Sequence, residues 1–289
     1  MSHLAARLWR HRGISGSLLL TPPMGWFVFI YLPALVVLLI TAFWTVNSFT
    51  GVIERDWSLD NFVYIFSSHT YRDIILRTIV MAAAVTITDV VLAFPVAYYC
   101  ARMASARIRI LLFLLMLLPL WSMFVGPMYA WRIILADQGI LNGLITSVGL
   151  SPLSISYSNW AVWIVFSYMW LPFVVAPTYA ALERIPESYL EASGDLGGRS
   201  WRTFRKVIMP LAVPGVIAGS IFCFSLTLGG YIVPSLLGGP GSDLLGNVIF
   251  ANVGAANNLP FAAALGIVPV VVMAVYLFFA RRLGAFDMM

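Results

Sequence analysis

Six apolar runs of about 20 residues or more constrain this chain more than any other feature of its sequence. A helix needs about 20 such residues to cross roughly 30 Å of hydrocarbon. Since 61% of the residues are hydrophobic and only 10% are charged, a soluble domain of 289 residues is excluded. The sequence therefore predicts an all-α integral membrane protein with six transmembrane helices, at residues 25–47, 78–100, 110–133, 160–182, 211–235 and 261–281.

The basic residues predict how the spans are oriented. Thirteen of the 17 fall on one side of the predicted spans, and only Arg55, Arg72, Arg77 and Arg132 remain for the other side. Lys and Arg accumulate in the cytoplasmic loops of membrane proteins. We therefore expect both termini in the cytoplasm. The expected parts are a cytoplasmic segment, the six-helix domain and a cytoplasmic tail, at residues 1–24, 25–282 and 283–289.

The stretch between predicted spans four and five is polar without being a loop of turn residues. Pro186 suits a first helical position, and residues 187–196 favour a short helix. Gly197 and Gly198 then allow a sharp turn, and Ser200 is expected to cap a second helix. This pattern predicts a helix–turn–helix hairpin at the cytoplasmic membrane surface. A basic juxtamembrane loop that only touches anionic lipid is the alternative.

A single aspartate, Asp89, lies near the middle of the second predicted span. An aspartate at a helix centre costs about 3 kcal/mol on insertion scales, which the apolar residues of the same span offset. The helix is therefore expected to insert, but Asp89 should not face lipid. Two interpretations remain open: a carboxylate held by Thr86, Thr88 or a neighbouring helix, and a carboxylate beside a substrate path.

Aromatic side chains suggest where such a path would run. Trp121 and Tyr129 share one helical face of predicted span three, although Tyr129 also lies near the outer membrane boundary. Trp170 lies on the same face of span four as Ser167. Tyr231 is at the glycine- and proline-rich outer end of span five. Together with Asp89, these four aromatic residues are the candidates for a substrate path.

Two smaller patterns predict local packing. Gly215 and Gly219 have the four-residue spacing that lets two membrane helices approach closely. Apolar residues at 62, 65 and 66 predict a short helix on the outer surface after span one. Cys100 and Cys223 fall within or at the ends of spans, so we expect packing residues instead of a disulfide.

The sequence lacks the patterns of an enzyme. It contains no GxxxxGK[ST] phosphate loop, so this chain is not expected to hydrolyse ATP by itself. His3, His11 and His69 form no metal-ligand spacing, and no metal site is expected. No HExxH, GxGD or Ser/His constellation of an intramembrane enzyme occurs in any predicted span.

The predicted hairpin carries a resemblance to a known family. Glu191-Ala192-Ser193, followed by Gly197 and later by Val207 and Pro210, resembles the EAA loop of ABC importer permeases. The resemblance implies a type I importer permease whose EAA loop, at residues 183–210, docks on a cytoplasmic ATPase in a bacterial inner membrane. The residues implied in that coupling are Glu191, Ala192, Ser193, Asp195, Leu196, Gly197, Val207 and Pro210.

Other segments are similar to spermidine/putrescine-type permeases, among them FPVAYYCARM at 94–103 and ALERIPESYLEASGDLGG at 181–198. This likeness implies a second, related permease subunit in a heterodimer, two ATPase subunits and a periplasmic or lipid-anchored solute-binding protein. ATP and Mg would bind the ATPase, and no cofactor is implied on this chain. The expected substrate is a polyamine or a related small amine or amino-acid-like cation.

One departure from that subgroup bears on the substrate. Polyamine-type permeases often carry an acidic residue before the aromatic at the outer end of span five, where this chain has Gly230 and Tyr231. Asp89 is expected to replace that carboxylate. An alternative function is a stand-alone secondary transporter driven by a proton on Asp89.

Overall fold

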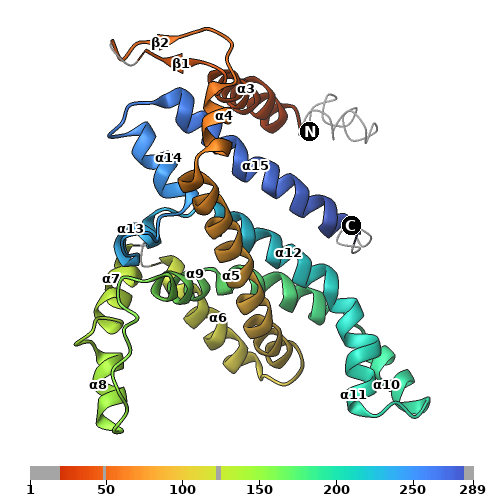
Figure 1. Cartoon of the computed structure of the whole chain (residues 1–289). Helices are drawn as coiled ribbons and strands as arrows, with labels where there is room; N and C mark the ends of the chain where they lie inside the picture. The colour runs from red at the N-terminus through yellow and green to blue at the C-terminus, as the bar shows by residue number, and fades with distance from the viewer. Residues whose placement is uncertain (1–19, 48–49, 122–124, 283–289) are drawn as a thin grey trace, which may run out of the picture.

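The computed structural model describes residues 20–47, 50–121 and 125–282, and helices make up most of them (Figure 1). From the first span to the third, the elements are η1 (Phe27–Tyr31), α3 (Leu32–Thr41), β1 (Thr45–Val46), β2 (Ile53–Glu54), α4 (Asp60–Ser67), α5 (His69–Arg102), α6 (Ala106–Trp121) and α7 (Val125–Ile134). The remaining elements are α8 (Ile140–Ser147), α9 (Asn159–Glu183), α10 (Glu187–Asp195), α11 (Ser200–Thr203), η2 (Phe204–Ile208), α12 (Met209–Leu228), α13 (Ile232–Leu237), α14 (Leu245–Val253) and α15 (Leu259–Arg282).

Within the described residues, five helices are long and apolar enough to cross a membrane. The helices α6 and α7 pass the same test only when they are counted together as one broken span, which would make six; they are bent by 97° at the break between them. The five continuous helices are Leu20–Thr41, His69–Arg102, Asn159–Glu183, Ser200–Leu228 and Leu259–Arg282. Five predicted spans therefore have a continuous counterpart, predicted span three falls on the bent pair α6 and α7, and the predicted fold class is confirmed.

The first span ends at Thr41, so the prediction that it extends to residue 47 is wrong. The Asn61 side-chain amide donates to the carbonyl oxygens of Ala42 at 3.1 Å and Trp44 at 2.8 Å. These carbonyls would otherwise accept bonds within a continuing helix. The chain instead forms the antiparallel pair β1–β2, and the predicted short surface helix follows as α4.

The fifth span also ends earlier than predicted, because α12 ends at Leu228 and α13 starts separately at Ile232. A Cβ atom on Gly246 would lie 2.9 Å from the Gly230 carbonyl oxygen and 3.1 Å from that of Gly229. The start of α14 therefore packs directly on the backbone between the two helices. Because the contacting residues are far apart in the sequence, the apolar pattern of the span itself could not predict this break.

The main core lies between α5, α9 and α12. Gly215 and Gly219 let α12 lie close against α9, since neither has a side chain. A Cβ atom added at Gly215 would lie 2.5 Å from the Pro177 oxygen, and one added at Gly219 would lie 2.8 Å from the Val174 Cα. The predicted close approach is therefore confirmed. Fully buried side chains of this core include Val85, Val162, Val165, Phe166, Met169, Val174 and Val175.

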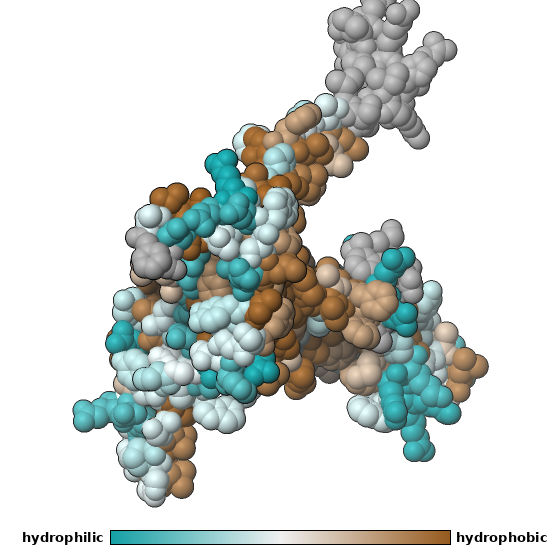
Figure 2. Space-filling model, turned by 45° about the horizontal axis from the view of Figure 1, so that its top comes forward, coloured by the Kyte–Doolittle hydropathy of each residue, from teal (hydrophilic) through white to brown (hydrophobic). Residues whose placement is uncertain are grey.

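A second cluster joins α15 to α4 and the N-terminal end of α5. The rings of Tyr64 and Phe261 lie 5.7 Å apart, and those of Tyr71 and Phe261 lie 5.2 Å apart. In Figure 1, α10 and α11 lie at the right with the end of α15, whereas α7, α8, α13 and α14 lie at the left. Figure 2 shows hydrophobic surface across the middle of the molecule and hydrophilic residues gathered at its extremities.

Candidate functional site

The predicted hairpin is present, with α10 as its first leg. Glu187 to Asp195 are helical as predicted. Pro186 is extended and directly precedes the helix, so it is not the first helical residue that was predicted. All side chains of α10 are at least partly exposed, and Leu190 alone packs against the main core. Glu187, Glu191 and Asp195 follow one another at four-residue intervals and are exposed. They therefore form an acidic stripe along one face of the helix.

The turn after α10 requires glycine at its first position. Gly197 has a φ of +75°, a conformation that L side chains rarely adopt. The Gly197 amide donates to the Gly194 oxygen at 2.8 Å, and the Gly198 amide donates to the Ser193 oxygen at 2.8 Å. This pair of bonds is a Schellman motif, which ends a helix and satisfies its last carbonyls. The turn exposes Leu196, whose relative accessibility is 88%.

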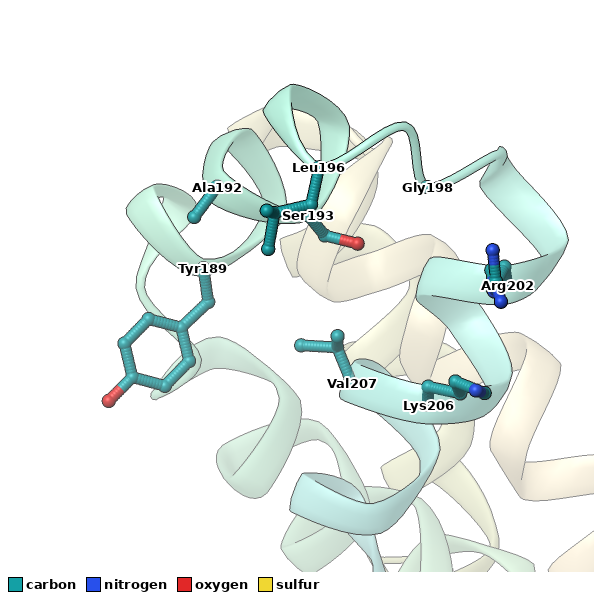
Figure 3. Close-up of a pocket in the computed structure, with 8 residues that line it drawn as sticks. All are labelled: Tyr189, Ala192, Ser193, Leu196, Gly198, Arg202, Lys206 and Val207. Carbon is teal, nitrogen blue, oxygen red and sulfur yellow. The ribbon is translucent and has the colours of Figure 1, made fainter.

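An open groove of about 530 Å³ separates the two legs of the hairpin. Figure 3 shows α10 and the turn on one side of it, and Arg202, Lys206 and Val207 on the other. The Ser193 and Thr203 hydroxyls are 2.8 Å apart and join the legs at the base of the turn. The residues lining the groove are Tyr189, Ala192, Ser193, Leu196, Gly198, Arg202, Lys206 and Val207.

The groove therefore unites four of the eight residues expected to contact an ATPase: Ala192, Ser193, Leu196 and Val207. Glu191 and Asp195 are exposed on α10, Gly197 forms the turn, and Pro210 is exposed near the start of α12. That any of these eight residues contacts an ATPase stays a prediction. Tyr189 and Thr203 were not anticipated, because their roles depend on how the turn folds the two legs together.

The prediction that Ser200 caps the second helix is wrong. The residue before α11 is Arg199, which makes no side-chain capping bond, and Ser200 is the first helical residue. The turn closes through the Schellman motif and the Ser193–Thr203 contact, so no hydroxyl at residue 200 is needed for it. The second leg then continues as the π turn η2 into α12.

Asp89 lies inside the main core and has a relative accessibility of 0%. The Cys223 thiol of α12 donates to its Oδ2 atom at 3.2 Å, and Ser167 of α9 is the other polar side chain beside the carboxylate. No well-aligned hydrogen bond from a described residue reaches Asp89 Oδ1 or the Ser167 hydroxyl. Asp89 therefore lies at the junction of three helices, and its role in a substrate path stays a prediction. Cys223 and Cys100 are both buried and free.

Two of the four candidate aromatics share a second pocket, of about 340 Å³. Trp170 and Tyr231 line it together with Phe166, whose ring stacks on that of Trp170 at 6.2 Å. Tyr231 is fixed by α14, because its ring stacks on Phe250 at 4.7 Å. Its carbonyl also accepts a bond from the Asn247 amide at 3.0 Å.

The other two candidate aromatics lie elsewhere. Trp121 ends α6 and is 73% exposed, whereas Tyr129 is in α7. The bend between these helices breaks the shared face that was predicted from helical spacing. Tyr129 lines a separate pocket of about 500 Å³ with Arg132 and Tyr157. The Tyr157 hydroxyl accepts bonds from Arg132 Nε at 3.1 Å and Nη2 at 2.8 Å.

Comparisons with known proteins extend over nearly the whole chain. It is 43% identical over 292 residues to the inner membrane ABC transporter permease protein YdcU of Escherichia coli (strain K12), a match that covers 96% of this chain and 93% of that protein. It is 32% identical over 257 residues to the spermidine/putrescine transport system permease protein PotB of the same strain, covering 88% and 92% of the two chains.

The fold also matches a solved structure. A chain of the bacterial alginate ABC transporter, in complex with alginate pentasaccharide-bound periplasmic protein, superposes with a TM-score of 0.74 over 95% of this chain and 96% of that chain. The two sequences are 21% identical, so this likeness concerns the fold alone. Residues 76–285 match the family described as "Binding-protein-dependent transport system inner membrane component". The chain belongs to this family and is an ABC importer permease subunit.

Proposed function

We propose that this permease subunit is driven by a cytoplasmic ATPase that docks on the α10–α11 hairpin, and that it forms half of a path for a small substrate carrying an ammonium group. A second, related permease subunit would form the other half. A solute-binding protein would deliver the substrate, and ATP and Mg would bind the ATPase. Both chain termini would then lie in the cytoplasm, on the side of the hairpin.

The hairpin geometry is the observation that carries the docking proposal. A helix with an acidic stripe and a protruding apolar tip at Leu196 offers a partner both charge and apolar surface. The Schellman turn and the Ser193–Thr203 contact hold that helix rigidly to the second leg. A partner that moves this helix would therefore move both attached spans. If Leu196 only faced water, its exposure would contribute nothing to the stability of the fold, so a partner that covers it explains the exposure better.

The docking proposal is tested with the substitutions Glu191→Ala and Gly197→Val. Valine at a φ of +75° is strained, so the turn changes shape, while Glu191→Ala removes one charge from the docking face. We expect the complex to remain in the membrane, or to assemble more weakly, and ATP turnover to become uncoupled from uptake. The measurement is uptake and substrate-stimulated ATP hydrolysis by the reconstituted complex.

Gly194→Ala is the matched control for this experiment. Gly194 lies within α10, and a Cβ atom added there meets no atom within 4 Å. Alanine at an exposed helical position should strengthen the helix by up to about 1 kcal/mol and leave coupling intact. Normal uptake and full substrate-stimulated ATP hydrolysis in both test variants would refute docking at this hairpin.

The ammonium proposal is supported by the pocket between α9 and the outer end of α12. Phe166, Trp170 and Tyr231 present aromatic surface there, and an aromatic face attracts a cation by about 0.5–2 kcal/mol. No acidic residue lines the pocket among the described residues. A Cβ atom on Gly230 would lie 2.7 Å from the Phe166 ring, so a carboxylate at residue 230 would require that ring to move.

Asp89 would then supply the negative charge from behind the pocket. Ser167, which lies beside its carboxylate, is three residues before Trp170 and therefore on the same side of α9. The spermidine/putrescine permease PotB is a relative at 32% identity, which agrees with an amine substrate. Uptake of labelled putrescine, challenged with an unlabelled diamine, a neutral sugar and an anion, tests the proposal. Competition by the sugar or the anion alone would refute it.

A further inference from the structure

One face of α5 contacts the point where α9 leads into the hairpin, and also its second leg. Phe94, Tyr98 and Arg102 follow one another at four-residue intervals, so their side chains lie on the same side of the helix. These residues occupy the last part of α5, close to the hairpin. We refer to them as the α5 stripe.

Arg102 binds the segment that leads into the first leg. Its Nη2 atom donates to the carbonyl oxygens of Leu182 at 2.9 Å and Ile185 at 2.7 Å. Leu182 is in the last turn of α9, where carbonyls lack helical donors and the helix dipole is negative. Ile185 is the residue directly before Pro186 and α10. A half-buried cation on α5 therefore fixes the point at which α9 becomes the hairpin.

Phe94 and Tyr98 hold the second leg through Phe204, the first residue of η2. The ring centroids of Phe94 and Phe204 are 5.6 Å apart with an interplanar angle of 90°. Those of Tyr98 and Phe204 are 5.9 Å apart at 86°. Edge-to-face contacts of this kind are a preferred arrangement for aromatic pairs. Trp201 stacks on Phe204 at 5.5 Å and extends the contact into α11.

The opposite end of α5 is bonded to the segment that positions Tyr231. The Leu245 amide, at the start of α14, donates to the Thr78 hydroxyl at 2.9 Å. Arg77 Nη1 donates to the backbone carbonyl oxygen of Asp243 at 3.3 Å. Since α14 carries Phe250 and Asn247, which hold Tyr231, one helix of 34 residues connects the hairpin to the wall of the aromatic pocket.

We propose that α5 receives the movement of the hairpin through the α5 stripe and carries it to α14 and the aromatic pocket. Arg102 is the positioning residue that makes the first leg move with α5. This inference rests on the proposed docking of an ATPase at the hairpin. It adds the route by which that movement reaches the substrate path, since α5 continues as one helix through Pro95 and is bonded to both segments.

The contact itself is tested on the purified chain by amide hydrogen exchange. Arg102→Gln removes the charge that binds the two carbonyls, and a charge-assisted bond of this kind changes a local opening equilibrium by about tenfold or more. We expect the amides of residues 187–196 to exchange about tenfold faster in Arg102→Gln. Arg107→Gln removes an exposed charge from the neighbouring helix and should exchange like the parent protein. Equal exchange in Arg102→Gln and the parent would overturn the contact.

The role in coupling is tested on the complete transporter. In Arg102→Gln we expect uptake per ATP hydrolysed to fall about tenfold, with Arg102→Lys recovering most of it and Arg107→Gln unchanged. If uptake and ATP hydrolysis fall in parallel with the amount of complex, Arg102 is only structural and the proposal is overturned. A parent complex without ATP-driven uptake would instead refute the proposed function, and hydrogen exchange would still decide the contact.

Discussion

Asp89 is a carboxylate enclosed by three helices, and its Oδ2 atom accepts a bond from the Cys223 thiol. Burial of a charge is expensive unless it is paired or hydrogen-bonded. The conservative change Asp89→Asn keeps the shape of the side chain and removes the charge. We expect uptake of an ammonium substrate to slow by about tenfold while expression and assembly stay near normal, measured as initial uptake rates at equal amounts of complex.

Cys223→Ala is the control for this prediction, because it removes the bond to Asp89 without changing any charge. If both variants slow uptake equally, the local packing is responsible and not the carboxylate. Unchanged uptake kinetics in Asp89→Asn would show that the charge of Asp89 has no part in transport and that its role is structural. The sequence identified Asp89 as unusual but could not place it, since the three helices that enclose it meet only in the folded chain.

Gly198 provides a second prediction at this scale. A Cβ atom there would lie 2.5 Å from the Ser193 oxygen and 2.6 Å from its hydroxyl oxygen. Gly198→Ala should therefore disturb the turn and the Ser193–Thr203 contact by about 1–3 kcal/mol. Faster amide exchange across α10 is the expected result, with Gly194→Ala as the control. Exchange rates equal to those of the parent protein would show that the turn can widen without cost.

The contact between α9 and α12 depends on glycine. At Gly219 an added Cβ atom would lie 2.8 Å from the Val174 Cα, which is backbone and cannot rotate away. Gly219→Ala should therefore destabilise the protein by about 1–3 kcal/mol. Thermal unfolding is measured by labelling of the buried thiols Cys100 and Cys223 with a fluorogenic reagent.

Gly266→Ala in α15 is the matched control, because a Cβ atom there meets no atom within 4 Å. Alanine is a better helix former than glycine by about 1 kcal/mol, so this variant should be neutral or slightly stabilised. An unfolding midpoint in Gly219→Ala equal to that of the parent would show that the two helices can separate without loss.

The elements were predicted from sequence to the extent that local patterns determine them. Hydropathy located the five continuous spans and the bent pair α6 and α7, because each depends on the apolar residues of a single segment. It missed the early end at Thr41 and the break after Leu228, which depend on Asn61 and Gly246 respectively. Both contacts come from residues 16 or more positions away.

The orientation of the whole molecule is tested by cysteine labelling. Ser200 and Ser154 are exposed and lie in the hairpin and in the loop before α9. Single Ser200→Cys and Ser154→Cys variants, in a background lacking Cys100 and Cys223, should react from opposite faces of the membrane. An impermeant thiol reagent added outside intact cells should label only the second. Labelling of both from outside would contradict a six-span chain with a cytoplasmic hairpin, and the cysteine-less background should not label at all.

The π turn of η2 sets the rotation of the hairpin about the axis of α12. Such a turn bonds each amide five residues back, so it contains one residue more than the corresponding turn of an α-helix. Each residue of an α-helix advances the chain by about 100° and about 1.5 Å. Conversion of Phe204–Ile208 to α-helical bonding would therefore turn the hairpin by roughly a quarter of a revolution with little axial shift. The direction in which the acidic stripe of α10 points is thus fixed by the hydrogen-bond register of five residues.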